Sequence, residues 1–261
     1  MDETRARAAS DLLVGHWDAG TRIDALPEQL RPSTRAEGYA IQAQVERRSA
    51  SSLFGWKIAA TSQAGQRHIN VDGPLAGRIL AEKVREPGAT IPLSGTLMRV
   101  AEIEFAFRFG RDLPPRPTPY GVAEVLEAVA SLHPAIEIPD SRYTDFCAVG
   151  AAQLIADDAC AHLFMLGPAS DAPWRQADLA AAPVSATLNG EETRHGKGAN
   201  ALGDPRVALA WIVNELSGLG LTMQAGQVVT TGTCVVPVEV APGDEVRGDW
   251  GPYGTLSVRF A

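Results

Sequence analysis

Residues 100–107 alternate between two kinds of side chain in a pattern typical of a β-strand with two unlike faces. Successive side chains of a strand point to opposite faces, so Ile103 and the two phenylalanines after it form an apolar face. Glu102 and Glu104 lie side by side on the other face, where their like charges repel each other. Two interpretations remain open. In the first, solvent or basic side chains surround the two glutamates. In the second, the two glutamates bind a hard divalent cation such as Mg²⁺ or Mn²⁺, which relieves the repulsion and prefers oxygen ligands.

A third acid occurs in the next apolar segment that is typical of a strand. Glu137 stands between Ile136 and Ile138. It is either an outward-facing strand residue or the third member of a carboxylate site that leaves coordination positions open for water and substrate. In the second case a divalent ion would still leave a small negative charge, and an anionic, chelating substrate becomes plausible.

The bulk properties exclude several classes of protein. The chain is 45% hydrophobic and 21% charged, which is ordinary globular composition and excludes a wholly disordered chain. A net charge of −8 without a basic cluster argues against a nucleic-acid partner. The three scattered cysteines form no CxxC pair and favour a reducing compartment. The chain contains no run of about 18 apolar residues, so no membrane span is predicted. The first residues lack the apolar region of a signal peptide. We therefore expect a cytoplasmic protein with neither a membrane nor a nucleic acid as partner.

Hydrophobic periodicity and turn residues predict an α+β chain with helices first and strands later. Helical spacing covers residues 3–17, and a second helix begins near Thr34 and runs to about residue 51. Residues 54–60 are predicted to form a strand, and Ser62 to cap a short helix that ends near residue 69. Further strands are predicted at 96–100, 102–109, 135–138, 161–166, 184–188, 228–230 and 255–260, with helices at 121–132 and 204–216.

Five short phrases occur in an order that carries a family resemblance. They are Gly55-Trp56-Lys57-Ile58 with Thr61-Ser62, Glu102-Ile103-Glu104, Arg111-Asp112-Leu113-Pro114, Pro134-Ala135-Ile136-Glu137 with Asp140-Ser141-Arg142, and Thr230-Thr231-Gly232-Thr233. Each phrase alone is weak evidence. As an ordered set, they make the chain resemble the 2-keto-4-pentenoate hydratase (2-hydroxypenta-2,4-dienoate hydratase) family, within the fumarylacetoacetate hydrolase superfamily, from about Thr34 to the C-terminus.

The resemblance implies a fold, a cofactor and an assembly. It implies a mixed β-roll core with a small helical N-terminal region, and Mg²⁺ or Mn²⁺ bound by Glu102, Glu104 and Glu137. We therefore predict a single catalytic domain over residues 1–261, with a mainly helical part (1–75) and a β-rich metal-binding core (76–261). Members of the family form homo-oligomers, so we expect one here.

The resemblance also implies a reaction. The leading prediction is a lyase that adds water to a 2-hydroxydienoate or 2-oxo-enoate from aromatic-compound degradation and gives a 4-hydroxy-2-oxo acid. One alternative is a 2-oxo-3-enedioate decarboxylase of the 4-oxalocrotonate type, since both reactions need the same enolate-stabilising cation. The other alternative is a catalytically silent relative that only binds a 2-oxo acid.

Two residues are candidates for catalysis. Lys57 lies among apolar neighbours, where it is either a strand lysine that extends to solvent or, by the resemblance, a charge that holds the substrate carboxylate or enolate oxygen. Asp72 precedes Gly73-Pro74 and is either a turn residue or a proton-transfer group. Many relatives carry an acid at the position of Leu75, so this departure weakens the assignment of the base.

Four residues are candidates for substrate binding. Thr231 and Gly232 form a close-approach turn whose hydroxyl and N–H bind a carboxylate or only cap a strand. Cys160 stands where relatives often carry serine, and it is either a buried thiol or part of the pocket. Arg142 binds a distal carboxylate of the substrate or forms a surface ion pair.

Overall fold

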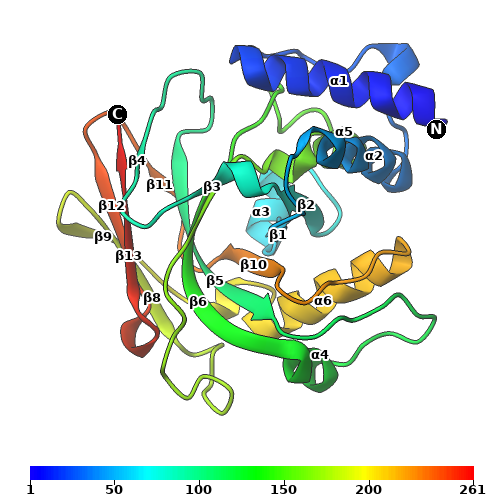
Figure 1. Ribbon diagram of the computed structural model, residues 1–261. Helices are drawn as coiled ribbons and strands as arrows, with labels where there is room; N and C mark the ends of the chain where they lie inside the picture. The colour runs from blue at the N-terminus through cyan, green and yellow to red at the C-terminus, as the bar shows by residue number, and fades with distance from the viewer.

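Two curved β-sheets form the body of the protein, and helices from the N-terminal region cover one end of it (Figure 1). The computed structural model describes the backbone of residues 1–261 and the side chains of residues 1–191 and 193–261. The mixture of helices with a strongly curled, mixed sheet confirms the predicted α+β class and β-roll core.

The larger sheet contains the segment with the alternating acids. Its strands are β1 (Gly55–Ala59), β2 (Leu75–Ile79), β3 (Val84–Arg85), β5 (Val100–Phe109), β6 (Val129–Ile138), β7 (Leu163–Leu166), β10 (Val228–Thr233) and β11 (Val238–Glu239). Their order is β2-β1-β10-β5-β6-β7-β3, and β11 pairs with the beginning of β5. The pairs β1–β10 and β3–β7 are parallel, whereas β5 runs antiparallel to both of its long neighbours.

The smaller sheet packs against the apolar side of the larger one. It consists of β4 (Thr90–Ile91), β8 (Pro183–Leu188), β9 (Glu191–Lys197), β12 (Glu245–Asp249) and β13 (Thr255–Phe260). The strand order is β4-β13-β12-β8-β9. Phe105 and Phe107 on β5 are fully buried, and Phe105 makes an edge contact with Tyr253 at 5.6 Å between ring centroids. The apolar face expected for this strand is therefore the face that builds the core.

Six helices and six short 3-10 segments connect and cover the strands. They are α1 (Glu3–Ala19), α2 (Arg35–Gln42), α3 (Gln63–His68), α4 (Val122–Ala128), α5 (Ala151–Ala156) and α6 (Pro205–Gly218), with η1 (Glu28–Leu30), η2 (Ala43–Arg48), η3 (Ala81–Lys83), η4 (Asp158–Cys160), η5 (Gly198–Asn200) and η6 (Gly251–Tyr253). Their starts follow local sequence, because Thr34, Ser62 and Asp204 each cap a helix as expected. None of the helices that the structure describes has both the length and the apolar character needed to cross a membrane.

Several predicted elements are wrong in their extent. The second helix, expected to run to about residue 51, is α-helical only to Gln42 and continues as η2 to Arg48. The helix expected over residues 121–132 ends at Ala128, because residues 129–132 pair with residues 107–109 at the end of β5 and the sheet outweighs the local helical spacing. Residues 96–99 are not a strand. The backbone N–H groups of Leu97 and Met98 both donate to Asp140 Oδ1, at 2.8 and 3.1 Å, and this holds the segment in a turn.

Candidate active site

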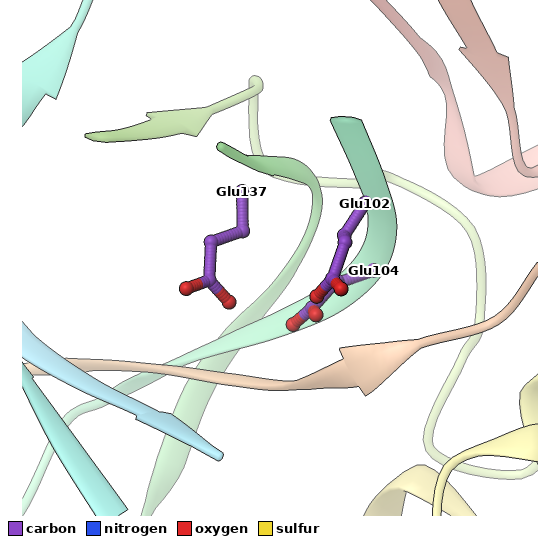
Figure 2. Close-up of side chains that lie close together, drawn as sticks. All are labelled: Glu102, Glu104 and Glu137. Atoms are coloured by element: carbon purple, nitrogen blue, oxygen red, sulfur yellow. The ribbon is translucent and has the colours of Figure 1, made fainter. Parts of the chain in front are cut away.

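Three glutamates converge on one face of the larger sheet, opposite the apolar core. Glu102 lies directly across from Glu137 in the antiparallel pair β5–β6, and Glu104 is one step further along the same face. One carboxylate oxygen from each residue lies within 4.8 Å of the other two. Figure 2 shows the three carboxylates pointing to the same side of the two strands. Glu104 and Glu137 are buried, with 0% and 2% of their surface exposed, whereas Glu102 is half-buried.

The hydrogen bonds of these carboxylates leave oxygen atoms free to bind a cation. Glu104 Oε2 accepts hydrogen bonds from Thr230 Oγ1 and from the backbone N–H of Gly232, the latter at 2.8 Å. Glu104 Oε1 and Glu137 Oε2 are buried without a hydrogen-bond partner. A buried carboxylate oxygen without a hydrogen-bond partner lowers the stability of the fold unless a nearby cation compensates its charge. The all-oxygen donor set is the set that Mg²⁺ or Mn²⁺ prefers, so the residues fit such an ion.

Burial and mutual repulsion dominate the electrostatics of the cluster. Burial raises the pKa of all three glutamates, and the neighbouring carboxylates raise the pKa of Glu104 further. Burial alone would lower the pKa of Lys57, but the carboxylates of Glu137 and Glu102 outweigh it and the net direction is upward. Lys57 is therefore an ammonium ion that shares a buried site with an excess of negative charge.

Lys57 reaches the cluster from β1. Its Nζ lies 2.9 Å from Glu137 Oε1 and donates to the carbonyl oxygen of Ala159 at 3.0 Å, with only 3% of the residue exposed. Gly77 lies directly opposite Lys57 on β2, and a Cβ atom there would come within 2.9 Å of Lys57 Cγ and Cδ. The absence of a side chain at position 77 therefore gives the lysine its path across the sheet.

The Ala159 carbonyl belongs to an unusual left-handed segment. Asp158, Ala159 and Cys160 have positive φ values of 54°, 50° and 62°, a conformation that costs non-glycine residues energy. Asp158 Oδ1 accepts a hydrogen bond from the backbone N–H of Arg78 at 2.7 Å and so ties this segment to the edge of β2. The sequence does not predict this segment, because only Asp158 is of a residue type that tolerates the left-handed region.

The sequence predicted a turn at Thr231 and Gly232, but both residues lie within β10, where its pairing with β5 is irregular. The Gly232 N–H binds Glu104, and its φ of 101° together with the close approach of Thr61 requires glycine, since a Cβ would lie 2.1 Å from Thr61 Oγ1. The Thr231 hydroxyl donates to the carbonyl of Phe105 at 3.0 Å. Thr230 makes the side-chain bond to the cluster, because the register of β10 on β5 places it on the face of the acids, and no local pattern in the sequence reveals that register.

Arg142 is buried and its guanidinium is fully engaged within the protein. The guanidinium of Arg142 is buried against Trp17 and donates to Asp157 Oδ1, to the Asp157 carbonyl and to the Ala161 carbonyl. Its charge is therefore balanced inside the protein and not at the surface.

Burial raises the pKa of the Cys160 thiol to about 12, and the nearby Lys57 ammonium acts in the opposite direction. Cys160 is thus a protonated thiol beside the lysine end of the cluster.

The structure does not bring Asp72 to the glutamates. Its side chain is 83% exposed and pairs with Arg35 Nη1 at 3.0 Å on the surface. Of the two roles expected from the sequence, Asp72 has that of a turn residue, since it lies in the bend between α3 and β2.

Comparisons with known proteins agree with this architecture. Residues 76–261 match the family model of the fumarylacetoacetate (FAA) hydrolase C-terminal domain. The chain is 31% identical to a 2-keto-4-pentenoate hydratase of Paraburkholderia xenovorans, over 100% of this chain and 96% of that protein. It is 33% identical to a 2-hydroxyhexa-2,4-dienoate hydratase of Comamonas testosteroni, over 81% of this chain and 80% of that protein. These hydratase relatives confirm the prediction of a lyase-type enzyme.

A solved structure of a related enzyme has the same fold. The 4-oxalocrotonate decarboxylase from Pseudomonas putida G7, complexed with magnesium and adipate, superimposes with a TM-score of 0.90. The two proteins are 25% identical, and the match covers 100% of this chain and 99% of the decarboxylase. By its fold and its full-length relatives, the chain belongs to the 2-keto-4-pentenoate hydratase family within the fumarylacetoacetate hydrolase superfamily.

Proposed function

We propose that this enzyme is a divalent-metal-dependent hydratase that adds water to a 2-hydroxydienoate or 2-oxo-enoate and forms a 4-hydroxy-2-oxo acid in aromatic-compound degradation. The observation that carries the proposal is the group of three glutamates with oxygen atoms within 4.8 Å of one another. The hydratase names of relatives that cover this chain from end to end support the reaction.

Glu102, Glu104 and Glu137 would hold the Mg²⁺ or Mn²⁺ ion. When bound, the ion would supply a Lewis acid for the carboxylate and the C2 oxygen of a 2-oxo acid, which stabilises negative charge on that oxygen. A structural neighbour complexed with magnesium and another complexed with calcium support a divalent cation in this fold. The Thr230 hydroxyl and the Gly232 N–H fix the orientation of Glu104, so its second oxygen stays directed at the cluster.

Lys57 would supply the positive charge on the protein side of the site. Its ammonium is held between Glu137 Oε1 and the Ala159 carbonyl, and one N–H remains for an anionic oxygen of the substrate. Because the group is buried, water screens its charge poorly, and its attraction for an enolate or carboxylate oxygen is strong. Cys160 and Gly232 lie at the borders of the same region and would contact the substrate there.

A 2-oxo-3-enedioate decarboxylase is the second candidate, because the decarboxylase structure superimposes so well. A dioate carries a distal carboxylate that needs its own cationic partner. The residue proposed for that role from sequence, Arg142, has its guanidinium occupied by Asp157 and two backbone carbonyls. This favours a substrate with a single carboxylate, and therefore the hydratase.

The test is to give the Mg²⁺-loaded enzyme both kinds of substrate. We expect a 2-hydroxydienoate to yield a 4-hydroxy-2-oxo acid, and a chelator to abolish this activity until Mg²⁺ or Mn²⁺ is restored. Release of carbon dioxide from a 2-oxo-3-enedioate, without hydration of the dienoate, would establish the decarboxylase instead. Binding of either substrate without turnover would indicate a silent relative.

We propose further that the protein is a cytoplasmic homo-oligomer whose partner is the small-molecule 2-oxo acid. The net charge of −8 and the scattered cysteines support this setting, as does the family resemblance. Light scattering coupled to size-exclusion chromatography measures the oligomeric state, and a monomer at micromolar concentration would contradict the proposal.

A further inference from the structure

A serine and a histidine on β6 form a hydrogen-bonded pair outside the glutamate cluster. Ser131 Oγ lies 2.8 Å from His133 Nε2, and His133 Nδ1 lies 2.8 Å from the carbonyl oxygen of Gly167. Both side chains are on the same face of β6 as Glu137, and Ala135 separates them from it. The proposed hydratase does not use this pair.

The Gly167 carbonyl fixes the tautomer of the imidazole. A carbonyl oxygen only accepts hydrogen bonds, so Nδ1 of His133 carries the proton of the neutral ring. Nε2 is then an acceptor, and the Ser131 hydroxyl is the donor. Burial lowers the pKa of His133, which keeps the ring in its neutral, basic form near neutral pH. The hydroxyl therefore faces an oriented base.

An arginine completes the surroundings. Arg108 lies directly opposite Ser131 in the β5–β6 register, and its charge acts on His133. Its guanidinium donates to the carbonyl of Gly226 at 2.8 Å and lies 5.7 Å from the ring of Phe54. Gly226 and Phe54 line a surface hollow of about 280 Å³. Ser131 is half-buried, so its side chain is in part exposed to solvent.

This combination contains the parts of an activated nucleophile: a hydroxyl, a base within hydrogen-bond reach and a group that orients the base. We propose that Ser131 is a second reactive centre, a nucleophilic serine that His133 activates and that accepts an acyl group from an activated carboxylic ester. Arg108 stabilises the negative charge that develops on the carbonyl oxygen.

The step is a balanced acyl transfer. Ser131 Oγ forms a bond to the carbonyl carbon of the ester, and the bond from that carbon to the leaving oxygen breaks. The hydroxyl proton passes to His133 Nε2 and from there to the departing alkoxide or to water. The product is an ester on Ser131, and no oxidant, reductant or metal ion takes part.

The experiment uses p-nitrophenyl acetate and the full-length protein. We expect a burst of about one equivalent of p-nitrophenolate, with peptide mass mapping placing one acetyl group on Ser131. Ser131→Ala removes the burst, and His133→Gln slows it by at least about tenfold, because general-base assistance is lost. Ser257→Ala, which changes a half-buried serine on β13, is the matched control and retains the burst.

The pattern of labelling decides the outcome. Circular dichroism and hydratase turnover verify that each variant is folded, and neither should change in Ser131→Ala. A burst that persists in Ser131→Ala, acetyl groups spread over lysines only, or no burst at all would overturn the proposal. If Ser131→Ala fails to fold, the comparison of wild type with His133→Gln still decides, since an unchanged rate there excludes activation by His133.

Discussion

Glu102 faces Glu137 directly across the antiparallel pair of β5 and β6. Like charges in this relationship destabilise a sheet, and here the second residue is fully buried. Lys57 balances only part of that charge, although its Nζ lies 2.9 Å from Glu137 Oε1. The pairing is thus an arrangement that a divalent cation would stabilise.

Mg²⁺ should stabilise the wild-type protein, and the effect should depend on Glu104. At a concentration of one hundred times Kd, binding adds about 2.7 kcal/mol to the free energy of unfolding. Glu104→Gln keeps a side chain of the same shape but removes one ligand charge, so the Mg²⁺-induced rise in Tm and the turnover should both be lost. Without metal, the variant should be at least as stable as wild type, because a repelled carboxylate is gone. Differential scanning calorimetry with and without Mg²⁺ measures this, and full turnover in Glu104→Gln would refute the metal mechanism.

Gly77→Ala should displace Lys57. The new Cβ would lie 2.5 Å from the Asp158 carbonyl oxygen and 2.9 Å from Lys57 Cγ, so the lysine or the left-handed segment must shift. Overpacking of this kind costs about 1–3 kcal/mol of stability. We expect kcat to fall by far more than the fraction of folded protein. Gly73→Ala is the matched control, because a Cβ there meets no atom within 4 Å. Equal activity of the two variants would show that the path of Lys57 is not restricted.

Arg142→Met should damage stability more than substrate recognition. The change leaves the carboxylate of Asp157 buried without its partner, which costs about 3–5 kcal/mol. Adding Asp157→Asn to the variant should restore part of that stability, because the uncompensated charge is removed. Urea unfolding measures the effect. A large rise in KM with unchanged stability would instead assign Arg142 to the distal end of the substrate.

Asp72→Asn should leave turnover nearly unchanged. The side chain is 83% exposed, and its ion pair with Arg35 is of the surface type that contributes at most about 1 kcal/mol. Steady-state kinetics at saturating Mg²⁺ provide the test. A loss of about a hundredfold in kcat would return Asp72 to the role of proton-transfer group that the sequence suggested.

Acid should destabilise the protein partly through His162. Burial, followed by the charges of Arg142 and Lys83, lowers the pKa of His162 from 6.5 to about 3 in the folded protein. Between these two values the unfolded chain binds a proton that the native protein does not, so stability falls as pH drops below about 6.5. The expected loss at pH 5 is about 2 kcal/mol relative to pH 7 from this group.

The matching variant is His162→Asn, whose amide oxygen takes the place of the ring nitrogen that accepts from Trp17 Nε1 at 2.8 Å. Its stability should change less between pH 7 and pH 5 than that of the wild type. Urea midpoints at the two pH values measure the difference. Equal pH dependence of the two proteins would exclude His162 as a source of acid sensitivity.

The sequence by itself determined the local features whose signals lie within a few residues. The helix caps at Thr34 and Asp204, the two faces of β5 and the acids at positions 102, 104 and 137 all follow from side-chain chemistry and periodicity. The resemblance of five ordered phrases then identified the family and its fold. These features depend on short-range rules, and the tertiary structure leaves them intact.

Only the tertiary structure decided which polar groups meet. Thr230 rather than Thr231 bonds to Glu104, because the register of β10 on β5 sets the face of each side chain. Arg142 is occupied by Asp157, and Ala159 presents its carbonyl to Lys57 from a left-handed segment. These contacts join residues that are far apart in the chain, and their geometry depends on strand register and packing, which no local pattern encodes.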